Sequence, residues 1–321
     1  MSTPSRVLLL GATGTIGRAT LAALLARGHQ VTCVLRPGSE ATLPEGAGRV
    51  AVDLTDADAM ARKGFGDLRA ETLVSCMASR TGAPGDAWAV DHGAHANALA
   101  AGRAAGVTHM VLLSAICVQK PLLEFQRAKL AFEAALMESG IDWTIVRPTA
   151  FFKSLSGQVA RVAAGKPFLV FGDGRLTACK PISDRDLGAY LADCVGDEGR
   201  RGRILPIGGP GPAITPLDQA AMLSDLTGTP ARIRRVPVAM MSAIIGVLGG
   251  MGRVARPLRA KAEFARIGRY YATESMLVWD TERRRYDAAA TPETGRDTLR
   301  DHYAALLRGE VADDRGDHAV F

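Results

Sequence analysis

Short apolar runs alternate with longer segments of helical spacing through the first half of the chain. The runs indicate buried strands, because each is brief, rich in Val, Leu or Ile, and ends at glycine or a polar residue. We expect these strands at 7–10, 31–35, 50–52, 73–77, 110–113 and 143–146. The helices between them are expected at 15–26, 86–105 and 122–137. Alternation of this kind predicts an α/β fold with a doubly wound parallel sheet and helices on both of its faces.

The rhythm changes after Pro148. Strands are expected at 168–171 and 204–207, and a helix at 183–195. Thr215-Pro216 is typical of a helix start, because threonine caps the free N–H groups and proline suits the first turn. By the same reasoning, Thr291-Pro292-Glu293 is expected to begin the last helix.

A glycine-rich loop follows the first strand and opens the first helix. Its glycines recur at every third position in Gly11-Ala12-Thr13-Gly14-Thr15-Ile16-Gly17. The first glycine permits a tight turn, the second lets the backbone approach a pyrophosphate, and the third allows the helix to pack on the strand. The loop predicts a Rossmann-type, dinucleotide-binding core over residues 1–150. Residues 151–321 are then expected to form a smaller C-terminal substrate lobe, with elements that pack back on the core.

The residue after the second strand bears on the choice of cofactor. An acid there favours the free ribose of NAD, but this chain has Arg36, whose guanidinium can pair with a 2′-phosphate. We therefore expect NADPH. Asp53 and Leu54 follow the third strand, where the adenine ring would lie. The aspartate can accept a hydrogen bond from the adenine amine or cap its own turn.

Composition excludes several other classes of protein. The 321 residues are 47% apolar, which suits a globular core, and the five cysteines have no C-x-x-C pair. No signal or transit peptide is evident in the sequence at the N-terminus, and the longest apolar run, near 236–251, falls short of a bilayer span. His92 and His95 are expected on a helix surface, and we predict no metal site.

Basic charge is concentrated in one segment. The chain has 39 Lys and Arg against 33 Asp and Glu, whereas residues 231–269 hold nine basic residues and one acid. A nucleic-acid surface is one interpretation, but no nucleic-acid motif accompanies it. A pocket for a flat, apolar, anionic molecule or contact with anionic lipid suits the apolar and basic mixture better. A core helix followed by a solvated helix is the structural alternative.

Three features resemble the atypical and extended short-chain dehydrogenase/reductase superfamily: the glycine loop, Ser114 after the fifth strand, and Arg147-Pro148 after the sixth. That superfamily usually carries a Tyr-x-x-x-Lys pair on the next helix. Here the pair is Phe125 and Lys129, so the lysine fits and the acidic hydroxyl is missing. The resemblance implies that Lys129 binds the nicotinamide ribose, and that ordinary carbonyl reduction is not the reaction.

Longer strings are more specific. They are Cys76-Met77-Ala78-Ser79-Arg80, 113–118, 147–153 with Pro148 and Thr149, 178–183, 205–211 and 268–276 with Tyr270 and Tyr271. Over residues 6 to about 307 the chain resembles the NADPH-dependent divinyl chlorophyllide 8-vinyl reductases of (bacterio)chlorophyll synthesis. The resemblance implies cofactor contacts from Cys76, Met77, Ala78, Ser114, Lys129, Pro148 and Thr149. It makes Tyr270 and Tyr271 candidate proton donors, with packing tyrosines or water as alternatives.

The expected chemistry suits Phe125. Hydride added to a vinyl group leaves charge that the macrocycle delocalises, so no oxyanion needs a tyrosine acid. The alternatives are a reductase of another conjugated C=C substrate, as in isoflavone-reductase relatives, a non-catalytic NADP-binding redox sensor, or a quinone-complex assembly protein. We expect a cytoplasmic protein that binds a divinyl chlorophyllide-type pigment but no nucleic acid, and that contacts the inner (photosynthetic) membrane peripherally through 236–269.

Overall fold

The computed structural model describes residues 4–251 and 256–312. Its chain divides into two compact units, and the first holds residues 1–79, 84–148 and 184–206. The second holds 80–83, 149–183 and 207–321. Residues 184–206, which come after the expected boundary near residue 150, thus belong to the first unit.

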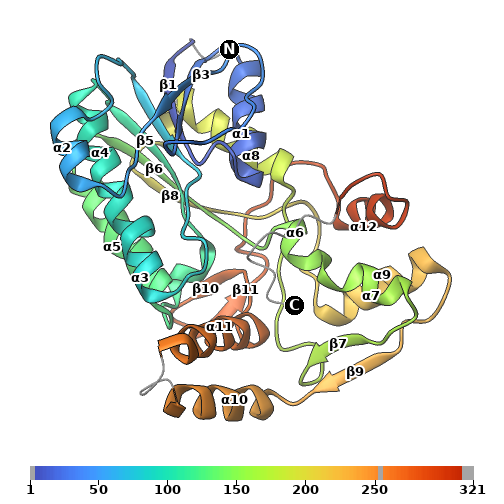
Figure 1. Cartoon of the computed structure of the whole chain (residues 1–321). Coiled ribbons are helices and arrows are strands. Elements are labelled where there is room, and N and C mark those ends of the chain that lie inside the picture. The colour runs from blue at the N-terminus through green and yellow to red at the C-terminus, as the bar shows by residue number, and fades with distance from the viewer. Residues whose placement is uncertain (1–3, 252–255, 313–321) are drawn as a thin grey trace. The chain divides into compact units, whose positions relative to one another are not determined.

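The first unit is built on strands and helices that alternate along the chain (Figure 1). Its strands are β1 (Arg6–Leu10), β2 (Gln30–Leu35), β3 (Gly48–Ala51), β4 (Thr72–Ser75), β5 (His109–Leu113), β6 (Asp142–Pro148) and β8 (Arg203–Ile207). Its helices are α1 (Thr15–Ala26), α2 (Ala57–Lys63), α3 (Pro84–Ala87), the π-helix η1 (Trp88–Ala94), α4 (His95–Ala104), η2 (Ile116–Gln119), α5 (Glu124–Met137), α8 (Asp184–Gly196) and η4 (Glu198–Arg200).

Seven strands form one sheet in the order β3-β2-β1-β4-β5-β6-β8. Strands β1 to β6 pair in parallel, with Leu9 opposite Cys33 on β2 and Val74 on β4. The chain moves outward from β1 through β2 to β3, and then restarts at β4 on the other side of β1. This reversal places a topological switch point at the carboxyl ends of β1 and β4, where such sheets bind ligands. The expected Rossmann-type fold is confirmed.

Helices cover both faces of this sheet (Figure 1). On one face, α4 and α5 bury a core that includes Ala98, Phe132 and Leu136 against Leu73 and Met110 of the strands. On the other face, α1 packs directly against α8. Their approach is close at Gly188, where a β-carbon would lie 2.6 Å from the carbonyl carbon of Ala19. Strand β8 adds to the edge of the sheet beside β6.

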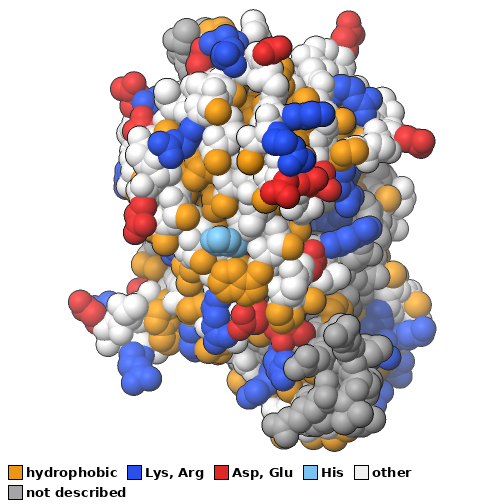
Figure 2. Space-filling view, turned by 60° about the vertical axis from the view of Figure 1, so that its left-hand side comes forward, with side chains coloured by type: hydrophobic (Ala, Val, Ile, Leu, Met, Phe, Trp, Pro, Cys, Tyr) orange, Lys and Arg blue, Asp and Glu red, His pale blue; other side chains and the backbone are white. Residues whose placement is uncertain are grey.

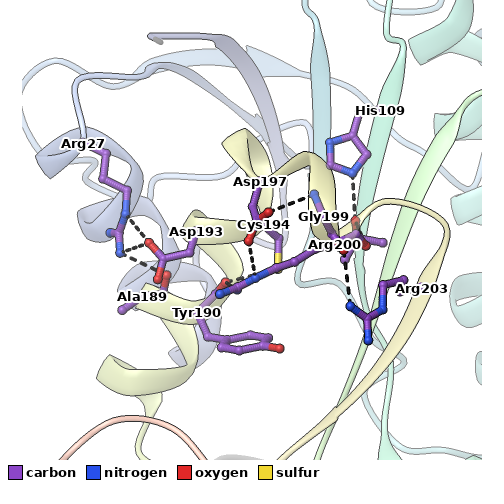
Figure 3. A network of polar contacts seen from close by, with 11 residues as sticks. Arg27, His109, Ala189, Tyr190, Asp193, Cys194, Asp197, Gly199, Arg200 and Arg203 are labelled. Carbon is purple, nitrogen blue, oxygen red and sulfur yellow. Dashed lines mark hydrogen bonds and ion pairs between the residues drawn. The ribbon is translucent and has the colours of Figure 1, made fainter. Parts of the chain in front are cut away.

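Charged side chains fasten α8 to the rest of the first unit (Figure 3). The Nη2 of Arg27, at the end of α1, donates to Asp193 Oδ1 at 2.6 Å. The Arg200 guanidinium lies 4.4 Å from the centre of the Tyr190 ring and 2.9 Å from Asp197. These contacts join α1, α8 and the turn before β8 into one layer.

The second unit contains two small two-stranded sheets, six α-helices and one short 3-10 helix among the described residues. Its elements are α6 (Phe152–Leu155), η3 (Ser156–Gln158), α7 (Val159–Ala163), β7 (Phe168–Phe171), α9 (Pro216–Thr227), β9 (Ile233–Val236), α10 (Val238–Met251), α11 (Arg256–Thr273), β10 (Val278–Asp280), β11 (Arg285–Asp287) and α12 (Leu299–Leu307). Its core packs Phe152, Phe168 and Leu223 around Tyr303, whose hydroxyl donates to the Leu155 carbonyl at 2.7 Å.

Two expectations about helices are corrected. The segment 86–105 is helical, but it is not one regular α-helix, because η1 widens to π-geometry over Trp88–Ala94. The last helix does not begin at Thr291-Pro292-Glu293. There the Thr291 hydroxyl donates to the Asp287 carbonyl, and Glu293 forms a bridge with Gly208. The cap is Thr298, whose hydroxyl accepts from the Asp301 N–H.

The apolar run expected to be either a core helix or a contact surface is α10, a helix with an exposed apolar stripe. Met240, Ile244 and Val247 are 50%, 46% and 61% exposed. It packs against α11, and no helix in the described ranges is long and apolar enough to cross a membrane.

Candidate functional site

The glycine loop lies at the switch point of the sheet and leaves no room for side chains at two positions. Gly11 has φ +73°, and a β-carbon there would lie 2.7 Å from the Cys76 carbonyl carbon. A β-carbon on Gly17 would lie 1.9 Å from the Gly11 carbonyl oxygen. Gly11 thus brings the ends of β1 and β4 together, and Gly17 lets α1 start against the loop, as the sequence predicts.

Gly14 has a different role, because the protein itself hardly crowds it. A β-carbon there would meet only the Gly11 oxygen, at 3.4 Å. Gly14 is the N-cap of α1, where we find no side-chain cap among the described residues and no acid in the first turn. Thr13 and Gly14 are exposed, Thr15 is half-buried and Ile16 is buried. The uncapped helix N-terminus fits a pyrophosphate, which its N–H groups and dipole favour.

The expected adenosine contacts stand after β2 and β3. Arg36 and Asp53 are exposed, and Leu54 is buried. Asp53 caps its own turn, since the N–H and hydroxyl of Thr55 both donate to its Oδ1, at 2.9 and 2.7 Å. These bonds hold the pKa of Asp53 below its usual range, and the Arg36 guanidinium adds to the effect. An arginine and an ionised carboxylate thus stand near each other beside the loop.

The end of β4 supplies the next expected contacts. Strand β4 stops at Ser75, two residues before the expected end at Met77. The Cys76 N–H donates to the Leu10 carbonyl at 3.0 Å, and the Met77 N–H donates to the Ser75 hydroxyl at 3.3 Å. Burial raises the pKa of the Cys76 thiol to about 12, so it stays protonated. Ala78 is exposed at the rim of this turn.

His95 is not on the helix surface, which corrects the expectation for it. Its ring is buried, its Nδ1–H donates to the Val90 carbonyl at 2.9 Å, and its Nε2 accepts from the Ser75 hydroxyl at 2.7 Å. Burial, then the nearby Lys129 charge, lowers the pKa of His95 to about 4. A neutral histidine therefore ties η1 to the end of β4. The described residues hold no group of three metal-ligating side chains.

Lys129 lies on α5, four residues after Phe125, and is not a solvated surface lysine. Its Nζ lies 2.9 Å from Asp91 Oδ1, and the two side chains are 12% and 0% exposed. Burial raises the pKa of Asp91, but the Lys129 ammonium and hydrogen bonds from Ser79 and Lys129 outweigh it and lower that pKa. Asp91, His95, Ser114 and Lys129 line one small cavity together with Leu112, Leu113 and Phe132.

Sequence reasoning missed Asp91 and the ion pair of Glu133 with Arg147. Asp91 belongs to η1, and π-turns inside helices are frequent at functional sites. The sequence does contain a signal for its burial, because Ala87, Ala94 and Ala98 recur around Asp91 at helical spacing. All three alanines are 0% exposed in the structure. Glu133 is also buried, and its carboxylate accepts from the Arg147 guanidinium at the end of β6.

The remaining expected residues lie around residue 148 and in the second unit. Pro148 ends β6, and the Thr149 hydroxyl donates to the Lys180 carbonyl. Tyr270 and Tyr271 lie on α11, with their rings edge to face and centres 5.6 Å apart. Tyr270 is 4% exposed and Tyr271 is 37% exposed. The two tyrosines thus belong to a different unit from the glycine loop.

Comparisons with known proteins agree with this geometry. A family model described as NAD(P)H-binding matches residues 11–198. Divinyl chlorophyllide a 8-vinyl-reductases from Arabidopsis thaliana and from Oryza sativa subsp. indica, both named as chloroplastic, are each 47% identical to this chain. The alignments cover 95% and 98% of this chain and 78% and 82% of theirs.

A solved structure shares the fold at low sequence identity. An NADPH-dependent quinone oxidoreductase from Escherichia coli, in complex with NADPH, superposes with a TM-score of 0.66 at 18% identity. The match covers 94% of this chain and 99% of that one. The protein therefore has an NAD(P)H-binding Rossmann-type fold, and the chain belongs to the divinyl chlorophyllide a 8-vinyl-reductase family.

Proposed function

We propose that this protein reduces the C8 vinyl group of divinyl chlorophyllide or protochlorophyllide to an ethyl group, with NADPH as the reductant. The observation that carries the proposal is the identity of 44–47% to reductases of that name, along nearly the whole chain. The site agrees with a C=C substrate, because Phe125 offers no acidic hydroxyl where carbonyl reductases of the superfamily need one.

NADPH, when bound, supplies a hydride from its nicotinamide ring. In our proposal the first unit holds it through the glycine loop, with Arg36 on the 2′-phosphate, Asp53 and Leu54 beside the adenine, and Ser114 and Lys129 on the nicotinamide side. Cys76, Met77, Ala78, Pro148 and Thr149 complete the expected cofactor contacts. The buried, charged pair of Lys129 and Asp91 supports this arrangement, because it fixes the lysine in one place.

The proton that completes the ethyl group needs a separate source. Tyr270 and Tyr271 remain our predicted donors, and Tyr271 is the one more open to solvent. Tyr271→Phe should lower the turnover rate and leave the dissociation constant of NADPH unchanged. An unchanged rate in both single phenylalanine variants would move the role to water.

The direct test is anaerobic incubation of the purified protein with NADPH and divinyl chlorophyllide. We expect a blue shift of the Soret band and a mass gain of two hydrogens at the vinyl arm. Deuteride from labelled NADPH should appear in that arm, and its appearance at another carbon would refute the mechanism. Binding of NADPH without any turnover of a pigment that a plant reductase accepts would favour a redox sensor.

Arg36 tests the preference for NADPH. A charge-assisted, bidentate bond to a phosphate is worth about 2 kcal/mol, so Arg36→Ala should weaken NADPH binding roughly 30-fold. The dissociation constant of NADH, which lacks that phosphate, should not change. Arg103→Ala, at an exposed arginine on α4, is the matched control. Equal losses for both cofactors in the Arg36 variant would contradict the assignment.

We also propose that the second unit contacts an anionic membrane surface through residues 236–269. Met240, Ile244 and Val247 follow helical spacing on one exposed face of α10. Exposed cations stand on either side of this helix in the chain, at Arg235 on β9 and Lys261 on α11. An exposed apolar stripe with neighbouring cations is typical of helices that lie in a lipid interface. Residues 252–255 lie outside the described residues.

The helices on one side of the first unit differ in charge pattern from this segment. Figure 2 brings the side of α2, α4 and α5 forward, where basic and acidic side chains are interspersed with apolar ones. Attraction to an anionic surface is therefore expected from the second unit, and we propose no nucleic-acid partner.

Vesicle sedimentation tests the membrane proposal. The wild type should bind vesicles rich in phosphatidylglycerol and bind neutral phosphatidylcholine vesicles much less, and added salt should reduce binding. The triple variant Met240→Ser, Ile244→Ser and Val247→Ser should lose the bound fraction. Leu122→Ser, at an exposed leucine of the first unit, should not. Failure of the wild type to bind anionic vesicles would refute the proposal.

A further inference from the structure

The ion pair between Asp91 and Lys129 uses only one of the two carboxylate oxygens. Asp91 Oδ1 accepts from Lys129 Nζ at 2.9 Å and from the Ser79 N–H at 3.1 Å. Asp91 Oδ2 is buried and has no hydrogen-bond partner among the described residues. An ionised carboxylate oxygen left in this state costs free energy, so a donor is expected to complete it.

A second buried polar atom stands at the same cavity. The hydroxyl oxygen of Ser114, directly after β5, has no hydrogen-bond partner in the described structure either. Asp91, Ser114 and Lys129 all line the small cavity, whose volume open to the centre of a water molecule is about 10 Å³. That room suits one oxygen atom, because a single water needs roughly 10–15 Å³ by this measure.

The hydrogen-bonding groups that line the cavity determine which chemical group can bind there. Asp91 Oδ2 can only accept, the Lys129 ammonium can only donate, and the Ser114 hydroxyl can do both. A hydroxyl group both donates and accepts, so it satisfies all three. A carbonyl or an anion has no proton to donate to the carboxylate. An amide carries its donor and its acceptor on two separate atoms and is too large for a cavity that holds one oxygen atom.

We infer that Asp91, together with Ser114, binds a ribose hydroxyl on the nicotinamide side of the cofactor, and that Asp91 also positions Lys129. The inference rests on the proposed use of NADPH and adds a binding residue that the tyrosine–lysine pattern does not contain. A resident water molecule has the same chemistry as a ribose hydroxyl, and the choice of titrant separates the two.

Calorimetric titration of the full chain tests the inference with two ligands. NADPH contains the nicotinamide ribose, whereas adenosine 2′,5′-bisphosphate contains only the adenosine half. Asp91→Asn keeps the shape and the Oδ1 acceptor but turns the second oxygen into a donor. We expect it to raise the dissociation constant of NADPH roughly tenfold and to leave that of the bisphosphate within twofold. Ser114→Ala should show the same selectivity with a smaller change.

Asp58→Asn removes an exposed acid of α2 and serves as the matched control. Unchanged NADPH binding in Asp91→Asn would overturn the inference. An equal loss for both ligands would also overturn it, because a resident water or a general distortion does not select one half of the cofactor. If Asp91→Asn loses affinity for NADPH alone, but the wild type reduces no vinyl group, then the proposed function is refuted and the ribose site stands.

Discussion

Acid should destabilise the first unit through a buried histidine on β5. His109 is 2% exposed, and its Nε2 lies 3.0 Å from the Thr144 hydroxyl oxygen. That hydroxyl donates to the Arg200 carbonyl, so the ring must donate from Nε2, and Nδ1 has no partner in the described structure (Figure 3). Burial, then the Arg201 charge, lowers the pKa of His109 to about 4.

The sign and size of the effect follow from proton uptake. A histidine in the unfolded chain has a pKa of about 6.5, so it gains about 0.7 proton between pH 7 and pH 5, while folded His109 stays almost entirely neutral. The stability that His109 contributes is therefore complete above pH 6.5 and is lost as pH falls toward 4. Over the interval from pH 7 to pH 5 the loss is about 2 kcal/mol. His95 also has a lowered pKa, so it adds a pH dependence of the same sign to the free energy of unfolding, both in the wild type and in variants of His109.

Urea unfolding at pH 7 and pH 5, followed by circular dichroism, measures this change. His109→Gln keeps an amide N–H for the Thr144 hydroxyl but cannot titrate. We expect its free energy of unfolding to depend on pH less than that of the wild type, by about 2 kcal/mol over this interval. Thr144→Val removes the hydrogen bond and keeps the histidine, so it should lower stability equally at both pH values. A His109→Gln variant with the wild-type pH dependence would refute the reasoning.

Two further predictions concern the loop and a buried ion pair. Gly17→Ala should destabilise the protein by more than about 3 kcal/mol in urea, because its methyl group would lie 1.9 Å from the Gly11 oxygen. Gly14→Ala should fold normally and bind NADPH roughly tenfold more weakly by calorimetry, and equal behaviour of the two variants would contradict their separate roles. Glu133→Leu leaves the Arg147 charge without its buried partner and should cost about 3–5 kcal/mol, most of which Arg147→Met should restore in the double variant.

The strands of the large sheet could be predicted because each is marked by a pattern of neighbouring residues. Val7 to Leu10 form an apolar run too short for a helix, and Gly11, Gly14 and Gly17 mark the turn that follows, so a buried strand is favoured. Helix α1 begins at Thr15, where its motif places it. Apolar runs and glycine spacing are properties of neighbouring residues, so one sequence displays them without knowledge of distant contacts.

The misses depend on residues far apart in the chain. Asp91 acquires its role from Lys129, which lies 38 residues later. The buried His95 accepts a hydrogen bond from the Ser75 hydroxyl, 20 residues earlier in the chain. A histidine among alanines does not reveal that partner in the sequence. Thr291 and Thr298 both stand where a helix N-cap could form. The residues after Thr291 instead pair with Gly208 in a β-bridge, so the helix begins only after Thr298. Such choices are made by tertiary contacts.

The interrupted path of the chain through the first unit has a consequence for synthesis on the ribosome. Helix α8 and strand β8 are translated only after residues 149–183 have emerged, yet they cover α1 and close the β6 edge. A nascent chain that ends near residue 150 therefore displays an open strand edge and the bare α1 surface that Gly188 later meets. The first unit therefore cannot complete its fold while only residues 1–150 have been synthesised. A gene truncated after residue 150 should yield a fragment that aggregates, and not a domain that folds and binds NADPH on its own.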